Sequence, residues 1–256
     1  MIEYRDIHKA FDAPVLTGVS LRVEQGECLS IVGPSGTGKS VLLKITNDLL
    51  QPDRGDVFIE GESVFNADRE GLEKIRRKIG YVFQYAALFD SMTVCENVCQ
   101  GLPEEEASRI RSPEVLRKVC EALEAVNLDP GRLVNVLPGD LSGGMRKRVG
   151  LARAIVGKPQ ILLYDEPVTG LDPVNSAVVG LLIKGIQKQM RVTSIVVTHH
   201  IDQALDISDR IALLEKGKLR FVGSPAEFSA SSDRLVQAFA DRRAASAAAL
   251  EIMEEL

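Results

Sequence analysis

Residues Gly33–Ser40 read GPSGTGKS, and the structure predicted for the whole chain starts from this stretch. It follows the apolar run CLSIV of Cys28–Val32 and precedes apolar residues at helical spacing, so the predicted order is strand, loop, helix. A glycine, four residues and then Gly-Lys-Ser in this context are typical of a phosphate-binding loop. Its glycines let backbone amides converge on phosphate oxygens, and the helix N-terminus adds partial positive charge. A chance glycine-rich turn would not need the strand and the helix on either side.

All residues of this loop are candidates for binding the phosphates of a nucleotide. Lys39 is expected to reach the β and γ phosphates, and the Ser40 hydroxyl to bind Mg²⁺. The remaining backbone is expected to surround the phosphates: Gly33, Pro34, Ser35, Gly36, Thr37 and Gly38.

A second motif, ILLYDE at Ile161–Glu166, supplies two acids at the end of a predicted buried strand. Asp165 is expected to position the magnesium ion, and Glu166 to accept a proton from the attacking water. Alone, an apolar run that ends in Asp-Glu is more often a strand that meets solvent. The functional interpretation therefore depends on the phosphate loop upstream.

A third motif is LSGGM at Leu141–Met145. Ser142 is a good helix N-cap, and the following Gly143 and Gly144 leave amides uncovered at the start of a helix, where they can bind a γ-phosphate. The alternative is a plain capped helix, which would not need two glycines.

Short apolar runs alternate with helices in the last third of the chain, a pattern typical of a buried parallel sheet in an α/β domain. Between Tyr85 and about Val156 the strand signals disappear and helical periods replace them. We therefore predict one α/β domain over 1–223 with a helical lobe at about 85–157, and a C-terminal helical extension over 224–256.

The composition limits the partners. The formal charge of −5 argues against nucleic acid, because no overall basic surface is available to neutralise phosphates. The N-terminus MIEYRDIHK lacks the apolar stretch of a signal peptide, and no run approaches the roughly 18 apolar residues of a membrane span. We expect a cytoplasmic chain that only a partner holds at a membrane.

The cysteines are expected to be reduced core thiols. None belongs to a paired CxxC set. Cys95 and Cys99 share a helical face at a spacing of four, but no His or acidic ligand accompanies them on that face, so a metal site is not expected.

Together the motifs resemble the ATP-binding-cassette (ABC) ATPases, whose pattern is a phosphate loop, a glutamine, the LSGGQ signature and a closing histidine. Here Gln84 ends IGYVFQ, Thr169–Asp172 reads TGLD, and His199 ends SIVVTH. The resemblance covers about Ile2–Val222. It implies an α/β fold of the P-loop NTPase class, with a mostly parallel core sheet, an antiparallel β subdomain and a helical subdomain.

The resemblance also implies the cofactors ATP and Mg²⁺ and further site residues. Phe11 matches the position that stacks on adenine, a contact worth ~1 to 3 kcal/mol in other base–aromatic pairs; the alternative is a core phenylalanine beside an edge strand. Gln84 is implied to contact Mg²⁺ or water, His199 to hydrogen-bond the γ-phosphate, and Asp172 to lie in the nucleotide site.

In this family two copies join head to tail, so the resemblance implies a homodimer. Ser142–Gly144 of one copy would then cover the ATP held by Gly33–Ser40 of the other. Closure is driven by ATP, because only the closed dimer makes contacts from both chains to it.

Within the family, the run FQYAALFDSMTVCENV from Phe83 looks like the ATPases of Mla/Mce-type phospholipid transporters. This implies an integral membrane permease, a lipid-binding MCE-type protein in the same complex, and a place at the cytoplasmic face of the inner membrane. Ala87–Val94 differs from the LFPHMTV of amino-acid importers, and Met145 replaces the glutamine of the signature. Tyr85 and His200 depart from the group's pattern; the register favours His199 over His200 as the phosphate contact.

Two surfaces are expected to meet partners. The apolar segment Leu88–Cys99 is a candidate dock for a permease helix, with ordinary lobe packing as the alternative. In the tail, apolar positions could pack on the chain itself or on its copy: Leu235, Phe239, Ala247, Leu250 and Met253.

Other functions remain open. The chain could serve an amino-acid or other importer, or a cell-division complex, whose cassettes are also single and short. A cassette acting on ribosomes or DNA is disfavoured by the lack of a second cassette, a coiled-coil insertion or a basic arm. A nucleotide kinase would not need LSGGM or the Asp172 loop.

Overall fold

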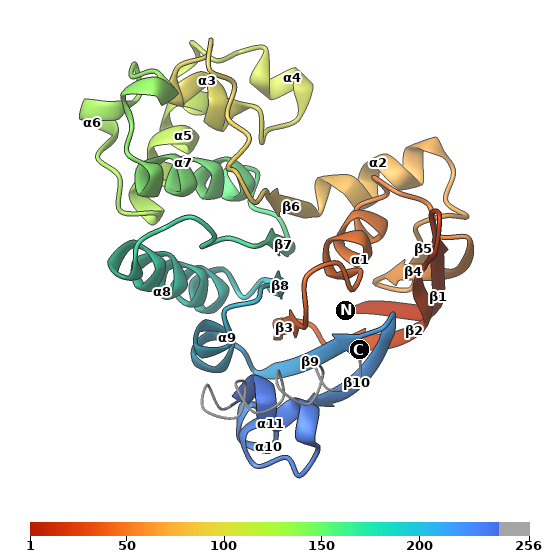
Figure 1. The fold of residues 1–256 in the computed structure, drawn as a ribbon. Helices are drawn as coiled ribbons and strands as arrows, with labels where there is room; N and C mark the ends of the chain where they lie inside the picture. The colour runs from red at the N-terminus through yellow and green to blue at the C-terminus, as the bar shows by residue number, and fades with distance from the viewer. Residues whose placement is uncertain (241–256) are drawn as a thin grey trace. The chain divides into compact units, whose positions relative to one another are not determined.

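The structure, a computed structural model, describes residues 1–240 (Figure 1). The packing divides the chain into two units. The first unit consists of Met1–Phe65 and Val196–Leu256, and the second of Asn66–Ile195. The chain therefore leaves the first unit after Phe65 and re-enters it at Val196.

An antiparallel sheet forms one part of the first unit, in the strand order β2-β1-β4-β5 (Figure 1). Its strands are β1 (Ile2–Ala10), β2 (Pro14–Val23), β4 (Arg54–Ile59) and β5 (Glu62–Ser63). In β1 a bulge at Asp6, with φ +52°, shifts the register between Tyr4 and Ile7. The bulge lets both of these side chains face the core although they are three residues apart.

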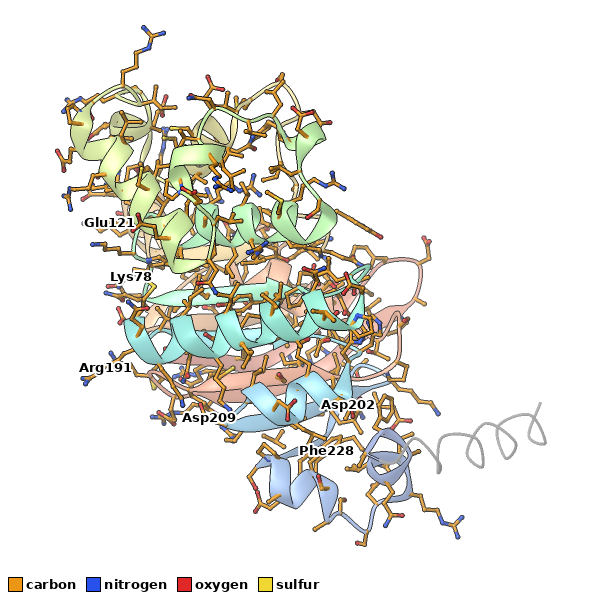
Figure 2. The ribbon with its side chains drawn as sticks, turned by 90° about the vertical axis from the view of Figure 1, so that its left-hand side faces the viewer. Lys78, Glu121, Arg191, Asp202, Asp209 and Phe228 are labelled. Atoms are coloured by element: carbon orange, nitrogen blue, oxygen red, sulfur yellow. The ribbon has the colours of Figure 1, made fainter. Side chains whose placement is uncertain are left out.

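A mostly parallel set of strands forms the other part of the first unit, in the order β10-β9-β3-β8. β3 (Cys28–Val32) pairs in parallel with β9 (Arg210–Glu215), and β10 (Lys218–Gly223) returns antiparallel at the edge. All five residues of β3 are buried. Asp209, labelled in Figure 2, accepts a hydrogen bond from the Cys28 amide at 2.8 Å and so helps fix the start of β9 beside β3.

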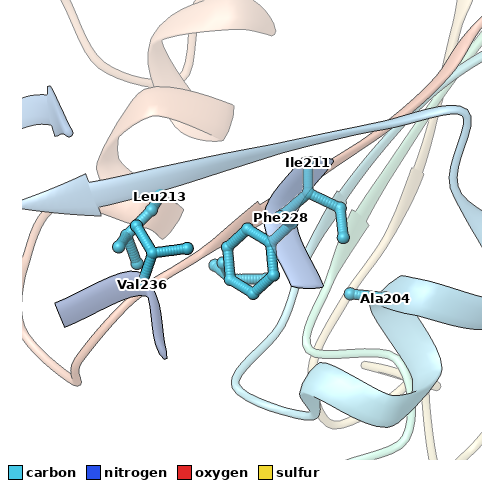
Figure 3. Packing of buried hydrophobic residues seen from close by; sticks show 6 residues of the cluster. Ala204, Ile211, Leu213, Phe228 and Val236 are labelled. Atoms are coloured by element: carbon cyan, nitrogen blue, oxygen red, sulfur yellow. The ribbon is translucent and has the colours of Figure 1, made fainter. Parts of the chain in front are cut away.

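The helices of the first unit are α1 (Lys39–Thr46), α9 (Ile201–Ile207), α10 (Pro225–Ser229) and α11 (Arg234–Ala240). Phe228 of α10 and Val236 of α11 are fully buried against Ile211 and Leu213 of β9 (Figure 3). Leu235 and Phe239 also pack on this cluster, so these two tail positions contact their own chain. The other tail positions named above, Ala247, Leu250 and Met253, lie outside the described residues.

The second unit contains β6 (Ile79–Val82) and β7 (Ile161–Asp165), which pair in parallel, followed in the strand order by β8 (Thr193–Val197). β8 spans the division between the units. The helices of the second unit, with one 3₁₀ turn, are α2 (Arg69–Arg77), α3 (Val94–Cys99), α4 (Glu104–Ala107), α5 (Pro113–Ala125), α6 (Pro130–Leu133), η1 (Pro138–Asp140), α7 (Gly143–Ile155) and α8 (Pro173–Met190).

The predicted fold class is confirmed: parallel strands, an antiparallel sheet and a helical segment are all present. Residues 85–156 contain helices and connections without a strand throughout this fully described segment. Capping explains several helix starts there, since Thr93, Ser112 and Ser142 each accept a backbone N–H at an N-cap. Within residues 1–240, no helix is both long and apolar enough to cross a bilayer.

Candidate nucleotide-binding site

The loop after β3 takes a course that requires glycine at its two ends. Gly33 has φ +149°, and a Cβ there would lie 2.2 Å from the carbonyl oxygen of Leu214. Gly38 has φ +100°, and a Cβ there would lie 2.7 Å from Leu16 Cδ2. Around Gly36 no heavy atom lies within 4 Å of the Cβ position. The loop is thus tightly packed where it leaves β3 and enters α1, and open between them.

Lys39 begins α1, and the loop itself holds its ammonium group. Nζ donates to the carbonyl oxygens of Gly33 and Pro34, each at 2.8 Å, and the residue is 7% exposed. These two acceptors fix the position of the ammonium group beside the loop. A fixed cation beside a glycine-rich loop suits the binding of phosphate.

The N-terminus of α1 adds a second feature that favours an anion. Its N-cap is Gly38, which has no side chain to accept from the first amides, and its first turn contains no acidic residue. The partial positive charge of the helix end is therefore not offset by a capping carboxylate. Ser40, half-buried in the same turn, places a hydroxyl there.

Two buried acids stand at the end of β7. Asp165 and Glu166 are 7% and 8% exposed. Glu166 has a left-handed backbone, with φ +49°, which is uncommon for a residue with a side chain. Thr169 stabilises this turn: its amide donates to the Glu166 carbonyl, and its hydroxyl donates to Glu166 Oε2, each at 3.2 Å. A buried, oriented carboxylate of this kind is suited to act as a general base.

Tyr81 of β6 orients the other acid. Its hydroxyl donates to Asp165 Oδ2 at 3.2 Å. Burial raises the pKa of Tyr81 well above its usual range, and the neighbouring Asp165 charge adds to the effect. The hydroxyl therefore remains a donor at any physiological pH.

The residues predicted to bind Mg²⁺ fit that ion in their chemistry. Asp165, Ser40 and Gln84 all offer oxygen, which is the donor that Mg²⁺ prefers. In the described part of the chain, no group of three or more His, Cys, Asp or Glu side chains is placed to hold a metal ion.

Gln84 lies two residues after β6, at the start of a tight turn. It is half-buried. Its carbonyl oxygen accepts a hydrogen bond from the ammonium group of Lys147 on α7. The position of Gln84 is therefore tied to the helix that begins after Ser142.

The LSGGM motif starts α7, as the sequence predicts. Ser142 Oγ accepts from the Met145 amide at 3.2 Å. Ser142 and Gly143 are exposed, whereas Gly144 is buried, and a Cβ on Gly144 would lie 2.5 Å from Asn175 Oδ1. A side chain in place of Gly144 would therefore displace the Asn175 side chain, and the exposed Ser142 and Gly143 present the helix N-terminus to the surface.

Asp172 has a structural function that the sequence analysis did not assign. It is the N-cap of α8 and accepts hydrogen bonds from the backbone amide of Asn175, at 3.0 Å, and from its side chain. These bonds hold the pKa of Asp172 below its usual range. Because Asn175 also lies beside Gly144, the Asp172 loop and the signature loop of one chain are linked.

His199 and His200 both lie on the surface just beyond β8. Their rings are 4.2 Å apart and tilted by 36°. β8 ends at Val197, so Thr198 separates His199 from the strand; the Thr198 hydroxyl accepts from the His200 amide at 3.0 Å. The two imidazoles are neighbours, and the choice of His199 as the phosphate contact stays a prediction.

Phe11 is 60% exposed, with Lys9 Nζ 5.7 Å from the centre of its ring. The alternative of a core phenylalanine is therefore wrong. An exposed ring beside a cation remains suited to stack on a base.

The predicted residues are divided between the two units. Phe11, the phosphate loop and His199 belong to the first unit, and the other predicted site residues belong to the second. Within each unit the structure places the candidates at the ends of neighbouring strands or helices.

Sequence reasoning missed two buried cations of α7. Lys147 and Arg153 are each only 8% exposed, and burial lowers the pKa of both; for Lys147 the nearby charge of Glu166 opposes this effect. Their neighbour Arg146 is exposed. Nothing in the run RKR at 146–148 indicates which cation the fold buries.

Known proteins share these features. Residues 16–169 match the family model described as ABC transporter. Protein TRIGALACTOSYLDIACYLGLYCEROL 3, chloroplastic, from Arabidopsis thaliana is 40% identical over 261 residues, which cover 94% of this chain and 73% of that protein. Methionine import ATP-binding protein MetN 1 from Pseudomonas fluorescens is 36% identical over 232 residues, which cover 89% of this chain and 68% of that protein.

A solved structure agrees in fold as well as in sequence. It is a dimeric structure of a post-hydrolysis state of the ATP-binding cassette MJ0796 bound to ADP and Pi. It matches with a TM-score of 0.77 and 33% identity, covering 88% of this chain and 99% of that one. The chain belongs to the ABC transporter family and is one of its ATPases.

Proposed function

We propose that this chain is the ATP-hydrolysing subunit of a phospholipid transporter, and that two copies close head to tail around ATP to drive a separate membrane permease. The observation that carries the ATPase chemistry is the buried Asp165–Glu166 pair at the end of β7. The lipid cargo is supported by the segment Ala87–Val94 and by a 40% identical relative whose name contains that of a galactolipid.

In the proposed reaction the phosphate loop binds the phosphates of ATP, and Glu166 acts as the general base. Lys39 contributes a charge that the carbonyls of Gly33 and Pro34 already hold in place, so little reorganisation is needed when phosphates bind. Glu166 takes a proton from the water whose oxygen bonds to the γ-phosphorus, while the bond from that phosphorus to the bridging β–γ oxygen breaks and ADP leaves. The Thr169 hydroxyl keeps the carboxylate oriented. Mg²⁺, held by Ser40, Asp165 and Gln84, would neutralise phosphate charge when bound.

The proposed dimer uses the exposed start of α7. Ser142 and Gly143 lie at the surface, where they can meet the γ-phosphate bound by a second copy. Support comes from the similar cassette MJ0796, which was solved as a dimer. ATP would then join the two copies, and loss of phosphate would release them.

Glu166→Gln tests the base. The variant keeps the size of the side chain and one acceptor oxygen but removes its basicity, so hydrolysis should fall by about 100-fold or more. With Mg-ATP the variant should elute as a stable dimer in size-exclusion chromatography with light scattering.

The matched control is Glu121→Gln, which changes an exposed glutamate of α5 in the same way (Figure 2). It should hydrolyse ATP at the wild-type rate. Brisk turnover by Glu166→Gln would remove Glu166 from its role.

Within the candidate dock Leu88–Cys99, ordinary packing of the lobe buries Val94, Cys95, Val98 and Cys99. The permease is therefore proposed to dock on the start of this segment and on the turn between it and β6. Phe83, Tyr85 and Phe89 are 38%, 81% and 50% exposed there, an unusual concentration of aromatic surface. Through this dock the chain would lie peripherally at the cytoplasmic face of the inner membrane, in a complex that also contains a lipid-binding MCE-type protein.

A pull-down tests the cargo. The tagged chain is purified from detergent-solubilised membranes, and its partners are identified by mass spectrometry, with Tyr85→Ala as the docking variant. A permease together with a lipid-binding protein supports phospholipid transport. Recovery of an amino-acid permease, as the methionine-import relative would suggest, or of septal proteins would refute phospholipid transport and indicate amino-acid import or cell division instead.

A further inference from the structure

The turn that carries Gln84 contains two consecutive residues with left-handed backbones. Ala86 and Ala87 have φ +60° and +46°. Neither is glycine, and even one residue with a side chain rarely adopts the left-handed conformation. Two in succession must therefore be stabilised by contacts from outside the turn. Within the turn, the Ala86 amide donates to the Phe83 carbonyl at 3.0 Å.

Helix α7 supplies this stabilisation from one face. Arg153 Nη2 donates to the Ala86 carbonyl at 2.6 Å, and Nη1 donates to the Ala87 carbonyl at 2.8 Å. Lys147 donates to the Gln84 carbonyl. Between them, a Cβ on Gly150 would lie 3.2 Å from Ala86 Cβ, so the helix and the turn are in close contact. We call Lys147, Gly150 and Arg153 the α7 clamp.

Two of the three clamp residues carry charges that are costly to bury. Lys147 and Arg153 are each 8% exposed. A buried cation is retained where its donors are used, and the planar fork of arginine matches two adjacent carbonyls in a way that a single ammonium cannot. The hydrogen bonds of Lys147 and Arg153 described above all end on carbonyls of this turn, and the Arg153 guanidinium also lies 5.9 Å from the centre of the Phe83 ring. The turn is therefore their structural target.

We propose that the α7 clamp positions Gln84 for ATP hydrolysis and makes the glutamine turn and the signature helix move as one body. Lys147, Gly150 and Arg153 are then positioning residues, which act through Gln84 rather than on ATP. The inference rests on the role of Gln84 in the proposed function. It goes further by naming the groups that connect Gln84 to the helix capped by Ser142.

The first experiment needs no nucleotide. Amide hydrogen exchange of the peptide spanning 83–89 is compared in the full-length wild type and in Arg153→Met. Loss of two charge-assisted hydrogen bonds should speed the exchange of the Ala86 amide by about tenfold or more. Arg148→Met is the control, because Arg148 donates from the same helix to the Asn127 carbonyl instead. Unchanged exchange in Arg153→Met would overturn the clamp.

The second experiment is a double-mutant cycle at saturating Mg-ATP. Lys147→Met and Gln84→Ala should each lower kcat by about tenfold or more, with KM for ATP within about twofold. If Lys147 acts through Gln84, the double variant should lose little more than either single variant. Additive losses would show that Lys147 acts elsewhere, for example on the neighbouring Glu166, and would overturn the inference.

The conservative variant Lys147→Arg keeps the charge and the donors, so it should recover most of kcat; unfolding curves establish that each variant is folded. A wild-type kcat in Gln84→Ala would instead refute the role of Gln84 in the proposed function, and with it the catalytic half of the inference. The two failures are therefore distinguishable.

Discussion

At the scale of single residues, the motifs of this chain coincide with backbone conformations that most residues avoid. Gly33 and Gly38 have positive φ at the two ends of the phosphate loop, and Glu166, Ala86 and Ala87 have positive φ although they carry side chains. The three residues with side chains are held by partners, Glu166 by Thr169 and the two alanines by Arg153. Strain of this kind persists only where surrounding contacts enforce it, and it concentrates at functional positions.

Gly33→Ala should damage the phosphate loop. The added Cβ would meet the Leu214 carbonyl at 2.2 Å, and relief requires movement of backbone. We expect a loss of about 2–3 kcal/mol in the free energy of unfolding, measured with urea, and weaker binding of a fluorescent ATP analogue. Gly61→Ala is the control, since its φ is also positive but no atom lies within 4 Å. Equal stability of the two variants would contradict the prediction.

Asp172 predicts a pH dependence. Hydrogen bonds from Asn175 lower the pKa of Asp172 in the folded state. Ionised Asp172 therefore stabilises the fold fully at pH values above its ordinary pKa of 3.8. This stabilisation is lost as the pH falls through the lowered folded pKa. Asp172→Ala should therefore be less stable than wild type at neutral pH, and the difference should vanish in strong acid. Urea unfolding curves over a pH series would show it; a difference that does not depend on pH would disprove it.

At the scale of elements, α7 is packed unusually closely with its neighbours. A Cβ on Gly80 of β6 would lie 2.3 Å from the Ala154 carbonyl, and one on Gly101 after α3 would lie 1.8 Å from the Arg153 carbonyl. Backbone thus meets backbone on two sides of the helix. Close packing of this kind transmits displacement rather than absorbing it.

Gly101→Ala tests this packing. Because the clash is with backbone, we expect destabilisation of about 2–3 kcal/mol, seen as a lower Tm. Gly185→Ala is the matched control on α8, where the Cβ meets nothing within 4 Å. Removing a glycine from an exposed helix should stabilise the chain by about 0.5–1 kcal/mol. Stabilisation by both substitutions would refute the close packing of α7.

At the scale of the whole molecule, the first unit is built from both ends of the chain. Val32 of β3 immediately precedes the phosphate loop, and it shares a buried cluster with Phe228 and Val236 from beyond residue 223 (Figure 3). The described part of the C-terminal segment thus belongs to the core that supports the loop. It is not merely an appendage to the strands.

Phe228→Ala should destabilise the chain by about 3–5 kcal/mol in urea unfolding, since Phe228 is fully buried and leaves a cavity. ATP affinity should fall as well, because the cavity lies beside Val32. Phe89→Ala removes a half-exposed ring and should cost much less stability. A small effect of Phe228→Ala would show that the C-terminal helices are dispensable for the first unit.

The sequence by itself determined the parts of this protein whose signals are local. The phosphate loop, the acids after the buried strand Ile161–Tyr164, the capped helix at Ser142 and the helical segment all follow from adjacent residues, because turns, caps and periodicity are properties of short stretches. The motifs also specified the family.

Only the tertiary structure decided which partners those parts have. The Tyr81 hydroxyl donates to Asp165, and Lys147 and Arg153 turn inward to the glutamine turn while Arg146 remains exposed. Each of these depends on residues brought together by the fold rather than by position in the chain. The identity of a charged residue cannot reveal whether the fold buries it, because burial depends on which distant backbone groups are brought to meet it.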